Sequence, residues 1–140
     1  MRIGVISDTH GLLDSRVAPY SPQLTPLMHA GGMGKPELID ALRTIAPVYA
    51  VEGNNDSFGE FPIERVEIFD GRTVLICHIS WELHQLDEPK KKMIEKTRAD
   101  VVAFGHSHRH LAKWWAAPAC STLAAPAPGA SLCCVRSAFY

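Results

Sequence analysis

Four short clusters in the sequence hold the residue types that bind divalent metal ions. The clusters are Asp8-Thr9-His10, Gly53-Asn54-Asn55-Asp56, His78 and Gly105-His106-Ser107-His108. In the first cluster and in the last cluster, two potential ligands lie two residues apart. On an extended backbone their side chains point to the same side, so both can bind one cation. Imidazole and oxygen ligands together suit manganese, iron, zinc or nickel, whereas calcium prefers oxygen alone. The clusters therefore predict a transition-metal site if the fold brings them together.

Each cluster taken alone also has a structural explanation. An Asp-x-His sequence after a strand is commonly a turn with a local side-chain contact, and Asn54 and Asn55 are amides that favour turns. His106 and His108 could be loop residues hydrogen-bonded to backbone, and His78 could be a core histidine with satisfied nitrogens. The order of all four clusters along one chain is the stronger signal.

Every cluster directly follows a short apolar run that predicts a buried strand. These runs cover residues 2–6, 48–51, 73–77 and 101–104. In α/β folds, functional side chains gather at the carboxyl ends of the strands. We therefore expect four strands that deliver polar side chains to one region.

Three further elements follow from turn and helix signals. The sequence from Val66 to Cys77 predicts a β-hairpin in which Asp70-Gly71 fills the left-handed turn positions. Pro36 suits the first position of a helix, which continues to Ile45 with apolar residues at helical spacing and ends before Pro47. Residues 90–97 predict a short surface helix.

Composition bounds the size and the partners of the protein. With 140 residues, 46% of them hydrophobic, the chain suits one compact domain. Fourteen basic and fifteen acidic residues give a net charge of -1, so nucleic acid is not indicated as a partner, and neither is an anionic membrane. No apolar run is long enough for a membrane span or a signal peptide, and the four cysteines match neither a zinc ribbon nor a disulfide framework. We expect a cytoplasmic protein, and a homo-oligomer stays open.

The order of the four clusters closely resembles the calcineurin-like metallophosphoesterases, most of all their small bacterial and archaeal phosphodiesterase branch. The resemblance covers residues 1–110 and includes His29-Ala30-Gly31 and the helix after Pro36. It implies an α/β fold in which a two-sheet β-sandwich is flanked by helices. It also implies two divalent transition metals, one held by Asp8, His10 and His108 and the other by Asn54, His78 and His106.

The function that this resemblance implies is metal-dependent hydrolysis of a small phosphate ester, most specifically a phosphodiester, by metal-activated hydroxide. Asn54 and Asn55 would bind the phosphate through their amide donors. The phosphatase branch usually has His at the position of Asn55, where it is a candidate acid for the leaving group. Asn cannot donate a proton in this way, which favours substrates with good leaving groups. No residue is assigned here as a catalytic acid or base.

Gly32 departs from the family pattern, which has Gly-Asp where this chain reads Gly31-Gly32. In the family that aspartate bridges the two metals. Two dications at close range repel each other strongly, so the loss of one carboxylate should weaken the second metal more than the first. The alternative function is therefore a catalytically impaired protein of the same fold that acts as a binding scaffold, since proteins of this fold include a retromer scaffold subunit.

Residues 114–140 differ in character from residues 1–113, the expected metallophosphoesterase domain. The segment is rich in Ala, Pro, Cys and Trp, contains no Asp or Glu, and shows no sustained helical or strand periodicity. The strands that the family has after Leu111 are not apparent in it. We expect an atypical, poorly packed tail that leaves the fold incomplete, and an out-of-frame reading of GC-rich DNA would produce such a composition.

Overall fold

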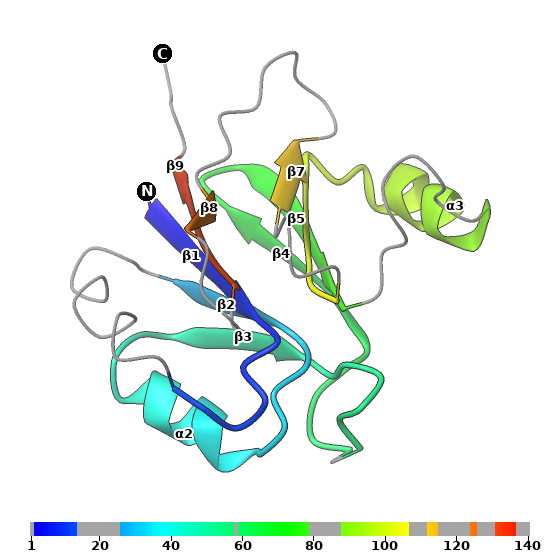
Figure 1. Ribbon diagram of the computed structural model, residues 1–140. Coiled ribbons are helices and arrows are strands. Elements are labelled where there is room, and N and C mark those ends of the chain that lie inside the picture. Colours follow the sequence, from blue (N-terminus) through cyan, green and yellow to red (C-terminus); the bar gives the residue numbers. More distant parts are fainter. Residues whose placement is uncertain are drawn as a thin grey trace.

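The computed structural model describes residues 2–13, 26–57, 59–78, 88–106, 112–114, 124–125 and 131–136. These residues form two sheets and two helices (Figure 1). The strands of the first sheet, sheet A, are β1 (Arg2–Ser7), β2 (Leu27–Ala30), β3 (Val48–Val51), β8 (Ala124–Ala125) and β9 (Ser131–Arg136). The strands of the second sheet, sheet B, are β4 (Glu64–Phe69), β5 (Arg72–Cys77), β6 (Val101–Phe104) and β7 (Ala112–Trp114). The helices are α2 (Glu37–Arg43) and α3 (Glu88–Thr97).

The two sheets pack face to face around one core. Sheet A has the order β3-β2-β1-β9-β8, with β1, β2 and β3 parallel and β9 antiparallel to β1. Sheet B has the order β4-β5-β6-β7, with β5 and β6 parallel. The core cluster between the sheets takes apolar side chains from both, including Val5 and Met28 of sheet A and Ile76 and Ala103 of sheet B. This is the β-sandwich that the sequence predicted.

Each helix covers the outer face of one sheet, which completes four layers. Ile39 and Leu42 of α2 pack with Ile6 and Ala50 of sheet A, whereas Ile94 of α3 belongs to a cluster on sheet B. The structure is therefore an α/β sandwich of two sheets flanked by helices, the fold class expected from the sequence. Neither described helix combines the length and the apolar character needed to cross a membrane.

The hairpin between β4 and β5 forms at the predicted place. Asp70 and Gly71 have φ angles of 49° and 72°, both in the left-handed region that a two-residue type I′ turn requires. The register pairs Phe69 with Arg72 and Glu64 with Cys77. Because β5 ends at Cys77, the hairpin delivers His78 to the carboxyl edge of sheet B.

Three strands, β7, β8 and β9, lie in the C-terminal region where the sequence predicted none. β9 pairs with β1 along its full length, from Arg2 opposite Arg136 to Ser7 opposite Ser131. Strand pairing uses backbone hydrogen bonds, so a strand can form in a segment without sustained side-chain periodicity. β7 also crosses the expected boundary at residue 114. Poor packing of residues 114–140 stays a prediction, since the side chains there lie outside the described part of the chain.

Candidate metal centre

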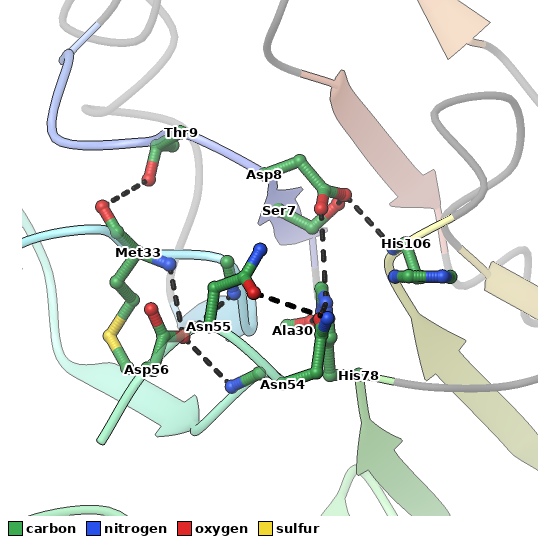
Figure 2. A network of polar contacts seen from close by, with 12 residues as sticks. Ser7, Asp8, Thr9, Ala30, Met33, Asn54, Asn55, Asp56, His78 and His106 are labelled. Atoms are coloured by element: carbon green, nitrogen blue, oxygen red, sulfur yellow. Dashed lines mark hydrogen bonds and ion pairs between the residues drawn. The ribbon is translucent and has the colours of Figure 1, made fainter. Parts of the chain in front are cut away.

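Asp8 follows β1 and presents one carboxylate oxygen without a hydrogen-bond donor among the contacts described. Its Oδ2 accepts a hydrogen bond from the Ser7 hydroxyl at 2.6 Å and another from the His106 backbone N–H at 3.0 Å (Figure 2). The residue is 2% exposed. The two donors orient the carboxylate, and its Oδ1 atom points toward His78. A buried negative oxygen in this position suits a cation.

His78 directly follows β5, and both of its ring nitrogens lie near oxygen atoms. Its Nδ1 lies 2.8 Å from the Ala30 carbonyl, while its Nε2 lies 3.0 Å from Oδ1 of Asn54 and 4.0 Å from Oδ1 of Asp8. A neutral imidazole carries one proton, and a proton on Nδ1 can be donated to Ala30. The Nε2 lone pair then faces two oxygens.

Nε2 of His78, Oδ1 of Asn54 and Oδ1 of Asp8 are the kinds of donor atom that the expected metal ion binds. A metal-binding histidine commonly donates its second ring N–H to a backbone carbonyl, as His78 can do with Ala30. Its Nε2, Oδ1 of Asn54 and Oδ1 of Asp8 converge from three different strand ends (Figure 2). The residues present therefore fit a divalent transition metal. Across the described residues, no group of three or more His, Cys, Asp and Glu side chains could hold a metal ion, and the set described above includes the amide oxygen of Asn54.

His106, which follows β6, joins the same group. Its backbone N–H binds Asp8, and its ring lies edge-on to the His78 ring with centroids 5.4 Å apart and an interplanar angle of 82°. Asp8, His10 and His106 have φ angles of 56°, 48° and 70°. Residues other than glycine rarely adopt this left-handed conformation, and it concentrates at functional sites.

The remaining predicted residues lie around this group or outside the described chain. His10 is exposed in the loop after β1, and its backbone N–H donates to the Gly32 carbonyl at 3.0 Å. Asn55 is exposed, and its Oδ1 lies 3.4 Å from Nδ2 of Asn54. His108 lies outside the residues that the structure describes. The structure thus brings together Asp8, Asn54, His78 and His106, with His10 and Asn55 exposed in the same loops as Asp8 and Asn54.

Gly32 faces Asp8 directly. A Cβ atom at Gly32 would lie 2.8 Å from Oδ1 and 3.0 Å from Cα of Asp8, and the φ angle of Gly32 is +71°. A side chain here would therefore project toward the oxygen that faces His78. A carboxylate at position 32 would therefore lie close to a metal bound by Asp8.

Asp56 organises the loop that contains Gly32, a role that the sequence analysis missed. Its Oδ2 accepts hydrogen bonds from the N–H groups of Gly32, Met33 and Gly53 at 2.8, 3.1 and 2.8 Å, and its Oδ1 accepts one from Gly34 at 3.0 Å. Burial raises the pKa of Asp56, but the four N–H donors lower it by more, so it stays below the usual value. In the sequence, an acidic residue after two asparagines could not be told from an ordinary turn.

His29 supports the site from inside sheet A. It is fully buried, and its Nε2 lies 3.0 Å from the Thr9 hydroxyl, between Asp8 and His10 in the chain. Burial lowers the pKa of His29 to about 4, outweighing the opposite effect of Asp56 and Asp8. Its Nδ1 has no hydrogen-bond partner among the described residues. His29 is therefore neutral near pH 7 and contacts the loop that carries the proposed ligands.

Comparison with protein families gives a match over most of the chain. Residues 1–124 match the family model described as the calcineurin-like phosphoesterase superfamily domain. All four clusters of candidate ligands lie within the matched range. The match ends at Ala124, the first residue of β8, and does not include β9.

Two curated relatives and one solved structure illustrate the similarity. A probable metallophosphoesterase from Methanothermobacter thermautotrophicus is 28% identical over 116 residues, which cover 78% of this chain and 67% of that protein. Another from Bacillus subtilis is 30% identical over 114 residues, covering 77% and 64%. Vps29 from Entamoeba histolytica, solved in complex with Zn²⁺, is 20% identical with a TM-score of 0.63, covering 79% and 66%. The chain thus spans about two thirds of the length of these relatives.

Proposed function

Because the chain belongs to the calcineurin-like phosphoesterase superfamily, we propose that it is a metal-dependent phosphoesterase whose substrates are small phosphodiesters. The observation that carries this proposal is the convergence of Nε2 of His78, Oδ1 of Asn54 and Oδ1 of Asp8. These atoms come from the ends of β5, β3 and β1, and all of them can donate a lone pair to a cation.

Two groups of residues would hold two divalent transition metals. Following the family pattern, one group is Asp8, His10 and His108, and the other is Asn54, His78 and His106. The metals could be manganese, nickel, iron or zinc, and the Zn²⁺ complex of Vps29 from Entamoeba histolytica shows that a protein of this fold can take zinc. When bound, such a pair neutralises negative charge on phosphate and makes hydroxide available near neutral pH.

The protein's own residues would orient the ester. The amide of Asn54 lies beside that of Asn55 at an exposed position, where both can donate hydrogen bonds to phosphate oxygens. Neither amide can protonate a leaving group. This favours phosphodiesters with good leaving groups, or a water molecule as the acid.

The test is hydrolysis of bis-p-nitrophenyl phosphate by the full chain with Mn²⁺, Ni²⁺, Fe²⁺ or Zn²⁺ in turn, alongside metal content per chain. The monoester p-nitrophenyl phosphate is the comparison substrate. We expect metal-dependent release of nitrophenol that is faster from the diester, and loss of this activity in Asp8→Asn. Faster hydrolysis of the monoester would contradict the phosphodiester preference. No hydrolysis with any metal would contradict the enzymatic function.

A second candidate function is a binding scaffold without catalysis, and Gly32 is the observation that favours it. Without a carboxylate at this position, the set of proposed ligands contains one acidic residue, Asp8, against two dications. The metal content would separate the two functions. A chain that binds one metal and hydrolyses neither substrate would agree with the scaffold, whereas two metals with hydrolysis would agree with the enzyme.

A further inference from the structure

β4 forms an edge of sheet B and exposes apolar side chains. Within the described residues it pairs with β5 alone. Val66 and Ile68 are 42% and 70% exposed, and Ile63 just before the strand is 74% exposed. An edge strand with exposed apolar side chains presents unpaired backbone groups to other chains and is a template for strand addition.

Val66 and Ile68 lie on the outer face of sheet B, beside the layer formed by α3. Val66 stands opposite Leu75 of β5, and Ile68 stands opposite Thr73. Ile94 of α3 packs in the cluster that contains Leu75, so the helix covers β5 and β6. Val66 and Ile68 stay accessible on β4.

The other face of β4 carries two opposite charges. Arg65 and Glu67 form an ion pair at 2.6 Å, and the Arg65 guanidinium lies 4.8 Å from the centroid of the Tyr49 ring on β3. Charges that point inward from an edge strand usually prevent it from pairing with other strands. Whether Arg65 and Glu67 prevent pairing depends on the charges that face them on the added strand.

We propose that a second copy of this chain adds to β4 in antiparallel fashion about a two-fold axis at Val66. In this register Arg65 stands opposite Glu67 of the second copy, and Glu67 opposite Arg65 of the second copy. Opposite charges directly across an antiparallel pair stabilise it, and like charges destabilise it. An axis at Arg65 would place two arginines opposite each other, and an axis at Glu67 two glutamates. The charges therefore select the register at Val66.

The same register also covers exposed apolar side chains on the outer face of β4. Val66 would lie against Val66 of the second copy, and Ile68 against the side chain of Glu64 of the second copy. The two four-stranded sheets would become one continuous sheet. Because each copy uses its single β4 edge, the contact closes at a dimer.

Charge reversal tests this register in the full chain. Arg65→Glu leaves two acidic residues on the inner face of β4, and Glu67→Arg leaves two basic residues. Each variant alone should be monomeric by light scattering and sedimentation equilibrium at concentrations where the wild type is dimeric. An equimolar mixture of the two should form dimers, because every cross-strand pair is then again of opposite charge. The double variant Arg65→Glu/Glu67→Arg should also dimerise.

A matched control is Arg43→Glu on α2. Arg43 also has an ion pair, to Asp40 at 2.9 Å, and also lies over an aromatic ring, that of Phe61 at 5.8 Å. This variant should leave the dimer unchanged. Circular dichroism checks the fold of each variant. If a charge variant does not fold, Val66→Lys takes its place, and Val66→Lys should be monomeric.

Three results would overturn the proposal. The first is a wild type that stays monomeric at every concentration. The second is dimers of the single charge variants as strong as those of the wild type. The third is a mixture of folded single variants that stays monomeric, since this would show that Arg65 and Glu67 do not face each other across the interface.

Discussion

The Nε2 atom of His78 lies 4.0 Å from Oδ1 of Asp8, although the two residues follow strands of different sheets. Asp8 follows β1 in sheet A, and His78 follows β5 in sheet B. Both side chains are almost fully buried. The contact therefore depends on how the two sheets pack, and the candidate site is a property of the whole sandwich.

Asp8→Asn should weaken metal binding by about 10²-fold or more. Loss of an outer-shell partner alone typically costs 10-fold to 100-fold in metal affinity, so loss of the charge on a direct ligand should cost no less. Asn keeps the size of the side chain, which limits effects on packing. Titration calorimetry with Mn²⁺ measures the change, and Asp40→Asn on the exposed face of α2 is the control. Equal affinity in wild type and Asp8→Asn would exclude Asp8 as a ligand.

Asp56→Asn should destabilise the fold by on the order of 3 kcal/mol. The carboxylate accepts four backbone N–H bonds, and an amide nitrogen in place of one oxygen would meet N–H groups that it cannot accept from. Urea unfolding monitored by circular dichroism gives the change in the free energy of unfolding.

Asp40→Asn is the matched control for the Asp56 variant as well. Asp40 makes an exposed ion pair with Arg43, and its side chain is 73% exposed. Such pairs contribute little to stability. The two variants should therefore differ clearly, and equal stabilities would show that Asp56 does not hold the Gly31–Gly34 loop.

Much of the fold could be predicted because local chemistry and tertiary structure agree. Asp70-Gly71 satisfies the positive φ angles of a tight hairpin, and this holds whatever packs around it. The runs before Asp8 and His78 are apolar because they lie inside the sandwich. The C-terminal strands could not be predicted, because residues 114–140 show no sustained strand periodicity in the sequence and the pairing of β9 with β1 joins opposite ends of the chain.

The candidate site was predictable in composition but not in its supporting contacts. Asp8 and His78 carry chemistry that is visible in the sequence, and their order along the chain matched a family. The role of Asp56 depends on backbone N–H groups of residues 32–34, about twenty residues away, and no side-chain pattern records such contacts. The burial of His29 likewise depends on how sheet A packs.

His29 predicts a loss of stability between about pH 6.5 and pH 4. Burial lowers its pKa from the usual 6.5 to about 4 in the folded protein, so the unfolded chain binds more protons in this window. The stabilising contribution is complete above pH 6.5 and is lost as the pH falls toward the folded pKa. The loss is on the order of 3 kcal/mol.

The measurement is the free energy of unfolding of wild type and His29→Gln across this pH range. Gln does not titrate, so the slope with pH should be shallower in the variant even if the variant is less stable throughout. Asp56 is present in both proteins, so the stability that its lowered pKa costs as the pH falls toward and below 3.8 affects both curves. Parallel slopes for the two proteins would contradict the buried, neutral state of His29.

Gly32→Asp should strengthen the second metal and raise the rate of phosphodiester hydrolysis. The proposed ligands include one carboxylate, Asp8, so the repulsion between two dications is poorly compensated. A Cβ at Gly32 would point at Oδ1 of Asp8 from 2.8 Å, which places a new carboxylate within reach of the same region. The φ angle of +71° is one that Asp and Asn tolerate better than most residues. The new Cβ would also lie 3.0 Å from Cα of Asp8, so both the side chain and the backbone of Asp8 must shift to admit it.

Gly32→Asn separates charge from shape, since it introduces the same strain and the same crowding of Asp8 without a negative charge. We expect the aspartate variant to bind two metals per chain and to hydrolyse bis-p-nitrophenyl phosphate about 10²-fold faster than the asparagine variant, given how strongly metal sites respond to changes in their ligands. Metal content by mass spectrometry and initial rates with Mn²⁺ provide both values. If the wild type already binds two metals and the aspartate variant changes neither quantity, another group bridges the metals and Gly32 is not the missing ligand position.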